Sequence, residues 1–284
     1  NDNNQKKTIK KASYIQEGYE NTDEWKIVSR HANDLFERGW LLKKKVERAA
    51  FFATISEFNQ RFLSTLGVNA DKVCIIRCGV DAEQFSQRKG FVENQPLKLG
   101  VIGRLVEKKG IDTLVEAISI LRKQDQKLAL SIAGSGPLMD ELTNLVQQRG
   151  LTQVEVKFLG AIPHTQVADF IESLDVFVLP CKQDKNGDMD GIPVVLMEAM
   201  LSAVPVISTE ISGIPELVID KETGLLVEPN NAQALAEAIL TISSDVSLRE
   251  SMMKHAVAKV ENEFSLQGNT KKLHALFSES VIDK

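Results

Sequence analysis

Short apolar runs and amphipathic helical stretches alternate along most of the chain. Six runs rich in Val, Ile and Leu have the length of buried strands, and they lie at 97–102, 127–133, 154–158, 175–179, 205–208 and 224–227. Helical periodicity fills the connections, at 111–123, 137–149, 165–173, 193–202 and 214–219. Because parallel strands need a crossover between them, this alternation predicts an α/β fold with a complete, doubly wound, Rossmann-like parallel sheet.

Proline and glycine indicate where helices begin and end. Pro137 and Pro193 are expected at the first position of their helices, where no N–H is needed. Gly150 is expected to end the helix that Pro137 begins. Three further helical stretches close the chain, at 232–243, 247–261 and 266–279.

Upstream of residue 97 the pattern is thinner. Strand-like runs lie at 25–30, 51–55 and 73–76, with one helical stretch at 57–66. The sequence therefore predicts an incomplete N-terminal Rossmann-like domain over 1–81 and a polar linker over 82–96. A complete domain over 97–264 and a helix over 265–284 that packs back toward the N-terminal domain are expected to follow. We also expect on the order of 100 further residues upstream.

Composition narrows the classes of partner. The 34 basic and 39 acidic side chains leave a formal charge of −5, which gives no electrostatic reason to expect a nucleic acid. No apolar run approaches the ~18 residues of a membrane span. Cys74, Cys78 and Cys181 form no Cys-x-x-Cys pair, so we interpret them as reduced, structural thiols of a cytoplasmic protein.

Three glycine-bearing loops follow predicted strands, at the edge of an open parallel sheet where ligands bind. The first loop, 103–110, places Arg104 and Lys109 beside a helix start, which suits a diphosphate; an ordinary solvated loop is the alternative. In the second loop, 134–137, Gly134 and Gly136 would let a ligand approach the backbone. A tight turn without a ligand is equally compatible with that loop.

The third loop continues into a helix and carries two carboxylates. Asp190 and Glu198 are separated by seven residues. The N–H groups of Val194 and Val195 would face a phosphate, helped by the helix macrodipole. Glu198 lies in an otherwise apolar helix, where a carboxylate is costly to bury unless a partner such as a ribose diol donates to it. A solvent-facing Glu198 is the alternative.

The order and spacing of these motifs resemble those of a known family. The matching segments are Gly103-Arg104, 107–110, 133–137, 158–160, Asp190-x7-Glu198, 213–216 and 224–227. They are similar to the C-terminal domain of retaining glycosyltransferase family 4, and most of all to bacterial exopolysaccharide enzymes of the colanic-acid type. The resemblance covers the chain from about residue 25 and is strongest over 97–229. It implies the GT-B fold, which consists of two Rossmann-like domains.

The resemblance also implies a role for each matching residue. Arg104 and Lys109 would bind the donor diphosphate and stabilise charge on the departing nucleotide. Glu198 would hold the ribose, and Asp190 would meet the sugar hydroxyls. Residues near 159–161 would flank the base. The other donor-binding residues that it implies are Gly103, Gly134, Gly136, Leu159, Gly160, Gly191, Ile192, Val194 and Val195, of which the first three would keep the pocket floor clear.

Two features of the third loop leave questions open. The family's usual first carboxylate is Glu, and Asp190 is one methylene shorter, so its part in sugar choice is open. Asp188-Met189-Asp190 is also an Asp-x-Asp triplet, which other glycosyltransferases use to hold Mn²⁺ or Mg²⁺. We expect no metal here, because Arg104, Lys109 and a helix N-terminus supply the positive charge.

His31 is the candidate from the N-terminal part of the chain. It follows the predicted strand at 25–30. The resemblance implies that a His in this place faces the donor sugar across the cleft, and a structural role is the alternative. The candidates for catalysis are therefore His31, Arg104, Lys109 and Asp190.

The function implied is transfer of a hexosyl group, with retention, from a UDP- or GDP-sugar to a saccharide or lipid-linked acceptor. Bacterial exopolysaccharide or cell-surface glycan synthesis is the expected setting, without a cofactor, in the cytoplasm, and at the inner face of the membrane if the acceptor is a lipid. No nucleophile is apparent, so electrostatic stabilisation would drive departure of the diphosphate. Two alternatives stay open: a nucleotide-sugar 2-epimerase on the same plan and a non-catalytic sugar-nucleotide binding module.

Overall fold

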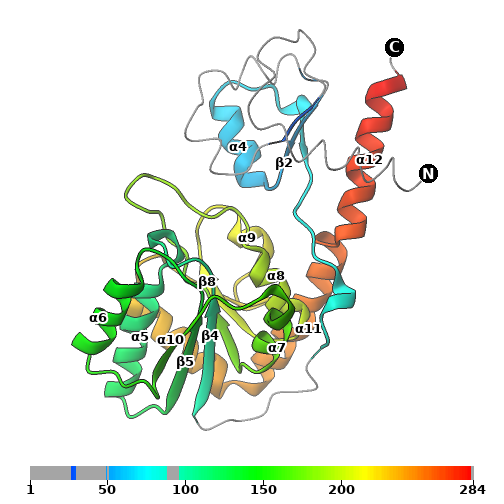
Figure 1. Ribbon diagram of the computed structural model, residues 1–284. Helices are drawn as coiled ribbons and strands as arrows, with labels where there is room; N and C mark the ends of the chain where they lie inside the picture. The colour runs from blue at the N-terminus through cyan, green and yellow to red at the C-terminus, as the bar shows by residue number, and fades with distance from the viewer. Residues whose placement is uncertain (1–26, 30–48, 50, 88–95, 283–284) are drawn as a thin grey trace. The chain divides into compact units, whose positions relative to one another are not determined.

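The computed structural model describes residues 27–29, 49, 51–87 and 96–282 (Figure 1). Contacts between residues divide the chain into two compact units. The larger unit is Cys78–Gly268, and the smaller unit combines Asn1–Arg77 with Asn269–Lys284.

A six-stranded parallel sheet forms the centre of the larger unit. Its strands are β4 (Leu97–Ile102), β5 (Leu128–Ala133), β6 (Val156–Gly160), β7 (Val176–Val178), β8 (Val206–Thr209) and β9 (Leu225–Val227). They are arranged in the order β6-β5-β4-β7-β8-β9. The chain thus builds outward from β4, returns to the middle at β7 and builds the other way, which is the Rossmann order. The predicted doubly wound sheet is confirmed.

Helices cover both faces of this sheet. They are α5 (Ile111–Lys123), α6 (Met139–Gln148), α7 (Val167–Glu172), α8 (Val194–Leu201), α9 (Ile214–Leu217), α10 (Ala232–Ser244) and α11 (Val246–Glu263). Helix α5 packs on α6 and α10 along one face, and α8 packs on α7 and α11 along the other (Figure 1). Because both faces are covered, every residue of β7 is fully buried. This explains the continuous apolar runs in the sequence.

Two of these helices begin later than their prolines predicted. Helix α6 starts at Met139, because residues 137–138 form a turn and the Leu138 N–H donates to the Leu105 carbonyl at 3.2 Å. Pro193 has an extended backbone and precedes α8, so it is the residue before the helix and not its first residue. The expectation for Pro137 and Pro193 at the first helical position is therefore wrong by one or two residues.

The smaller unit has a three-stranded parallel sheet among its described residues, in the order β1-β2-β3. The elements are β1 (Ile27–Ser29), β2 (Phe51–Thr54), α4 (Glu57–Thr65), β3 (Val73–Ile75) and α12 (Leu266–Ile282). Phe52 and Leu63 are fully buried in its core. The ring of Phe51 meets that of Phe277 edge to face at 5.9 Å, so the last helix contributes to this unit. His31 lies outside the described residues.

None of the described helices is both long enough and apolar enough to cross a membrane.

Candidate active site

The larger unit brings two of the predicted loops to the point where its strand order reverses. Strands β4 and β7 are neighbours, and their connections leave toward opposite faces of the sheet. The loop at 103–110 follows β4, and we call it the basic loop. The long loop at 180–193, which joins β7 to α8, is the acidic loop (Figure 1). A ligand at this edge of the sheet would lie between them.

Glycines allow the basic loop to pack against its neighbours. A Cβ on Gly134 would lie 1.8 Å from the Gly103 carbonyl oxygen, and one on Gly136 would lie 2.4 Å from the Leu105 carbonyl oxygen. The Leu105 N–H also donates to the Ser135 carbonyl at 3.0 Å. Close contact between two backbones therefore explains why Gly134 and Gly136 have no side chain. Their contribution to a pocket floor stays a prediction.

Four charged side chains join the basic loop to the acidic loop. Lys109 Nζ lies 2.7 Å from Asp190 Oδ2, and Lys108 Nζ lies 2.8 Å from Asp188 Oδ2. Lys108 Nζ also lies 3.5 Å from Asp190 Oδ1. Both lysine side chains are only 15% exposed. We call these four residues the lysine–aspartate cluster, which links two of the predicted catalytic residues directly.

Burial and charge together set the ionisation within this cluster. Burial alone would lower the pKa of Lys108, but the hydrogen bond that its ammonium donates to Asp188 and the charge of Asp190 outweigh that effect and raise the pKa. Lys108 therefore stays a cation at neutral pH. Burial, followed by the charge of Asp190, raises the pKa of the Cys181 thiol, which keeps its proton and donates to Asp190 Oδ2 at 3.5 Å.

Arg104 differs from both lysines. Its side chain is exposed, and no described residue forms an ion pair or a hydrogen bond with the guanidinium group. The N–H groups of Val194 and Val195, at the start of α8, likewise have no acceptor among the described residues. These donors are the groups that an anionic ligand at this edge would find available.

Glu198 is half-buried on α8, and no described residue donates a hydrogen bond to its carboxylate. Burial raises its pKa, while the charge of His164 acts in the opposite direction. A half-buried carboxylate without a donor is the state expected of a ligand contact before its ligand arrives.

The end of β6 contributes two of the residues that were predicted to lie near the base. Gly160 has a φ of +70° and open space where a Cβ would lie. Half-buried Leu159 precedes it, and the Gly134 N–H donates to the Gly160 carbonyl at 2.7 Å.

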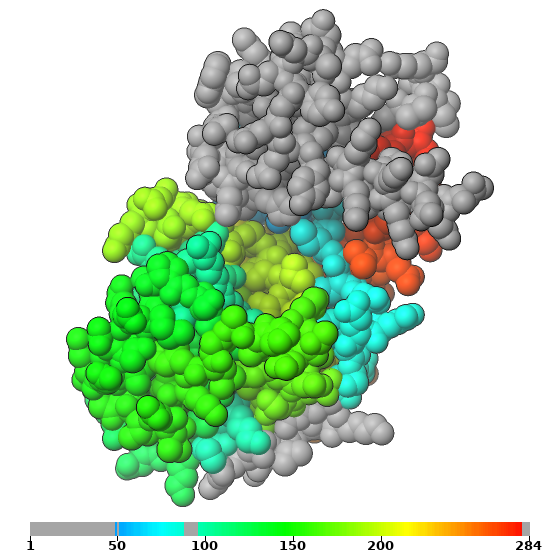
Figure 2. All heavy atoms as spheres, viewed as in Figure 1, coloured from blue at the N-terminus to red at the C-terminus, as the bar shows by residue number. Residues whose placement is uncertain are grey.

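The surface of the larger unit is hollowed on the face seen in Figure 2. The floor of this hollow is yellow, the colour of the segment around α9, and green segments of the chain form its sides. Helix α9 follows β8, so the hollow lies at the same edge of the sheet as the basic and acidic loops.

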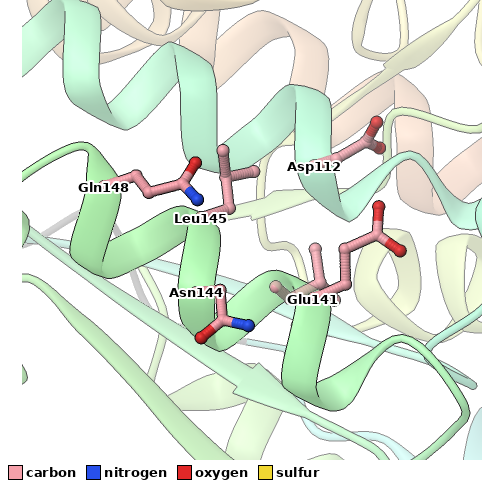
Figure 3. Close-up of a pocket in the computed structure, with 6 residues that line it drawn as sticks. Asp112, Glu141, Asn144, Leu145 and Gln148 are labelled. Carbon is pink, nitrogen blue, oxygen red and sulfur yellow. The ribbon is translucent and has the colours of Figure 1, made fainter.

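A second hollow, of about 470 Å³, lies on the outer surface between α5 and α6. Asp112 and Glu141 both direct their carboxylates over it (Figure 3). Asp112 is already bound by Lys182 Nζ at 2.5 Å. The negative charge of its lining would repel a diphosphate, so we do not assign the donor to this hollow.

The Asp-x-Asp triplet directs its carboxylates at lysines. Lys108 binds Asp188, and Lys109 binds Asp190. Among the described residues, no three His, Cys, Asp or Glu side chains gather closely enough to hold a metal ion.

The structure thus places all the predicted site residues except His31 at one edge of one sheet, and among their charged side chains it pairs Lys109 with Asp190. Lys108, which contacts both aspartates, was not among the predicted site residues. Neither was His164, whose charge acts on Glu198. The two adjacent lysines of the basic loop were the feature of the sequence that could have indicated Lys108. Spacing alone does not indicate which lysine contacts which aspartate.

This architecture, a complete Rossmann-like domain with charged loops at its switch point, is that of a GT-B glycosyltransferase. Residues 82–259 match the family model described as "Glycosyl transferases group 1", and the chain belongs to that family. It is 37% identical over 230 residues to the putative colanic acid biosynthesis glycosyltransferase WcaL of Escherichia coli K12 (81% of this chain, 56% of WcaL). It is 35% identical over 241 residues to the amylovoran biosynthesis glycosyltransferase AmsK of Erwinia amylovora (83% of this chain, 59% of AmsK).

The chain therefore spans just over half the length of these two relatives. Its fold is also that of Anabaena Alr3699/HepE, crystallised in complex with UDP. The TM-score is 0.77 at 20% identity, over 89% of this chain and 72% of the other. The GT-B fold expected from the resemblance is confirmed.

Proposed function

We propose that this chain belongs to an enzyme that transfers a hexosyl group, with retention, from a nucleotide diphosphate sugar to a saccharide or lipid-linked acceptor. The family and the exopolysaccharide relatives WcaL and AmsK support this proposal. The observation that carries it is the grouping of cationic side chains, unoccupied helix N–H groups and half-buried Glu198 at one sheet edge. Synthesis of an exopolysaccharide or another cell-surface glycan is the setting that we propose, at the cytoplasmic face of the membrane if the acceptor is a lipid.

The ion pairs indicate how the donor would be received. Lys109, held by Asp190 at 2.7 Å, would exchange this partner for the diphosphate, and Arg104 would bind the same group. Asp190 would then be free to accept hydrogen bonds from the sugar hydroxyls. As the glycosidic bond breaks, charge grows on the departing phosphate, and fixed cations in a partly buried site stabilise that charge.

Calorimetry with UDP-glucose and GDP-mannose, followed by product analysis, tests the proposal. Binding and transfer to an acceptor are expected, with the α-anomeric proton signal of the donor kept in the NMR spectrum of the product. Release of a free 2-epimerised sugar without an acceptor would favour the epimerase. Binding without any turnover would favour the binding module.

Removing metal ions with a chelator tests whether the transfer reaction needs a bound metal. Because lysines occupy both carboxylates of the Asp-x-Asp triplet, we expect excess EDTA to leave the transfer rate unchanged. Initial rates before and after dialysis against EDTA give the comparison. A complete loss that Mn²⁺ restores would instead assign a metal to Asp188 and Asp190.

Replacing Glu198 with Gln should change donor binding and stability in opposite directions. Folding raises the pKa of Glu198, so its ionised form destabilises the unliganded protein. This loss of stability is absent at pH values below the ordinary carboxyl pKa and is complete at pH values above the raised pKa of the folded protein. Because Gln carries no charge, E198Q should therefore raise Tm at neutral pH. Loss of the charged acceptor should weaken donor binding by about tenfold.

Calorimetry and thermal melts between acid and neutral pH check both effects. In the parent chain, donor affinity should fall as the pH drops through the raised pKa of Glu198, and E198Q should abolish this dependence. E141Q, at the hollow between α5 and α6, is the matched control and should leave donor binding unchanged. Equal donor affinity in E198Q and the parent would contradict the assignment of Glu198.

A further inference from the structure

Lys108 lies between the two carboxylates of the acidic loop. Its ammonium is 2.8 Å from Asp188 and 3.5 Å from Asp190. Lys109, the next residue, contacts Asp190 from the other side at 2.7 Å. In the unliganded protein the four charges therefore balance, and each carboxylate has a cation.

Binding of a diphosphate would disturb this balance. Asp190 and the donor diphosphate would compete for Lys109, because the proposed function requires Lys109 to bind the donor phosphates. Once it does so, the Asp190 carboxylate keeps two polar contacts with described side chains: the Lys108 ammonium and the thiol of Cys181, each at 3.5 Å. The Asp190 side chain is 16% exposed, and a thiol is a weak donor, so the carboxylate would be poorly compensated without Lys108.

Lys108 is itself held in place by groups outside the proposed donor contacts. Its backbone carbonyl accepts from the Lys182 N–H at 2.9 Å. Asp188, its nearer partner, donates its own N–H to Asp184 Oδ1 at 2.9 Å within the acidic loop. The Lys108 ammonium therefore has a carboxylate partner, Asp188, that is itself held within the acidic loop and is not the carboxylate that lies 2.7 Å from Lys109.

We propose that Lys108 is a positioning residue that holds Asp190 toward the donor sugar while Lys109 engages the diphosphate. Asp188 fixes the Lys108 ammonium for this purpose. This inference rests on the proposed function, and it adds that affinity for the sugar moiety, rather than for the nucleotide, depends on Lys108. It also explains how the shorter Asp190 is held at a defined distance from its ligand.

The test compares two dissociation constants by calorimetry on the chain and its variants. UDP is paired with UDP-glucose, and GDP is paired with GDP-mannose. K108M should reduce the ratio Kd(nucleotide)/Kd(nucleotide sugar) about tenfold, because Asp190 loses its fixed cation. K108R should restore most of the ratio, and D188N should lower it by about threefold. K182M, which removes the neighbouring ion pair to Asp112 but no contact to Asp190, is the matched control and should leave the ratio unchanged.

The direction of the change separates positioning from simple charge attraction. A nucleoside diphosphate carries more negative charge than the nucleotide sugar, so loss of a non-specific cation would weaken nucleotide binding more and raise the ratio. An unchanged or higher ratio in K108M and D188N, with nucleotide binding retained, would overturn the inference alone. Failure of the parent chain to bind any of the four ligands would overturn the proposed function and this inference with it. If K108M does not fold, D188N and K108R decide the question.

Discussion

Replacing Lys109 with Met is expected to lower the rate of sugar transfer by about 100- to 1000-fold, the effect typical of removing a group that stabilises transition-state charge. The ammonium of Lys109 lies at the sheet edge where the donor diphosphate is proposed to bind, and it is 15% exposed. In such a partly buried site water cannot replace it effectively. R104A should act in the same direction, although Arg104 is exposed and should contribute less.

The effect should appear mainly in kcat, because the charge that Lys109 meets grows as the bond breaks. Steady-state kinetics of K109M against calorimetric affinity for UDP or GDP separates the two contributions. K185M, which alters an exposed lysine of the same acidic loop, is the control and should retain the parent's rate. Unchanged turnover in K109M and R104A would remove both residues from the mechanism.

Most of the fold could be predicted because the buried faces of strands and helices require apolar residues at regular spacings in the sequence. Strand β4 and helix α5 coincide with the predicted ranges, since both faces of the sheet are covered and most of the buried positions of these two elements are apolar. The late start of α6 could not be predicted, because it depends on a hydrogen bond from Leu138 to Leu105, across two loops. Local proline rules do not contain that information.

The chemistry of the site was only partly accessible from the sequence. Motif order indicated that Arg104, Lys109, Asp190 and Glu198 share a site, and the resemblance supplied their roles. It did not indicate that Lys109 and Asp190 neutralise each other before a ligand arrives, because this pairing needs the two loops to meet at the switch point. The proposed role of Lys108 depends on its contacts with both Asp188 and Asp190, at 2.8 and 3.5 Å, which the spacing of residues along the chain does not indicate.

Gly110 makes that meeting of loops possible. It has a φ of +64°, which an L side chain adopts only at a cost of about 1–2 kcal/mol. A Cβ there would also lie 1.8 Å from the carbonyl oxygen of Pro180, which follows β7. The basic and acidic loops would have to separate to relieve this overlap, and the lysine–aspartate cluster bridges them.

G110A is therefore expected to lower the free energy of unfolding by about 3–4 kcal/mol, the sum of backbone strain and the overlap with a backbone that cannot move freely. G160A provides the matched comparison, because Gly160 has a similar φ of +70° but nothing within 4 Å of its would-be Cβ. It should lose only about 1–2 kcal/mol, which is the backbone term. Urea denaturation followed by circular dichroism gives both values, with an unchanged slope as the check that the unfolded states are comparable. Equal losses in the two variants would show that the basic loop does not press against Pro180, and the contacts proposed to preorganise the site would lose their structural basis.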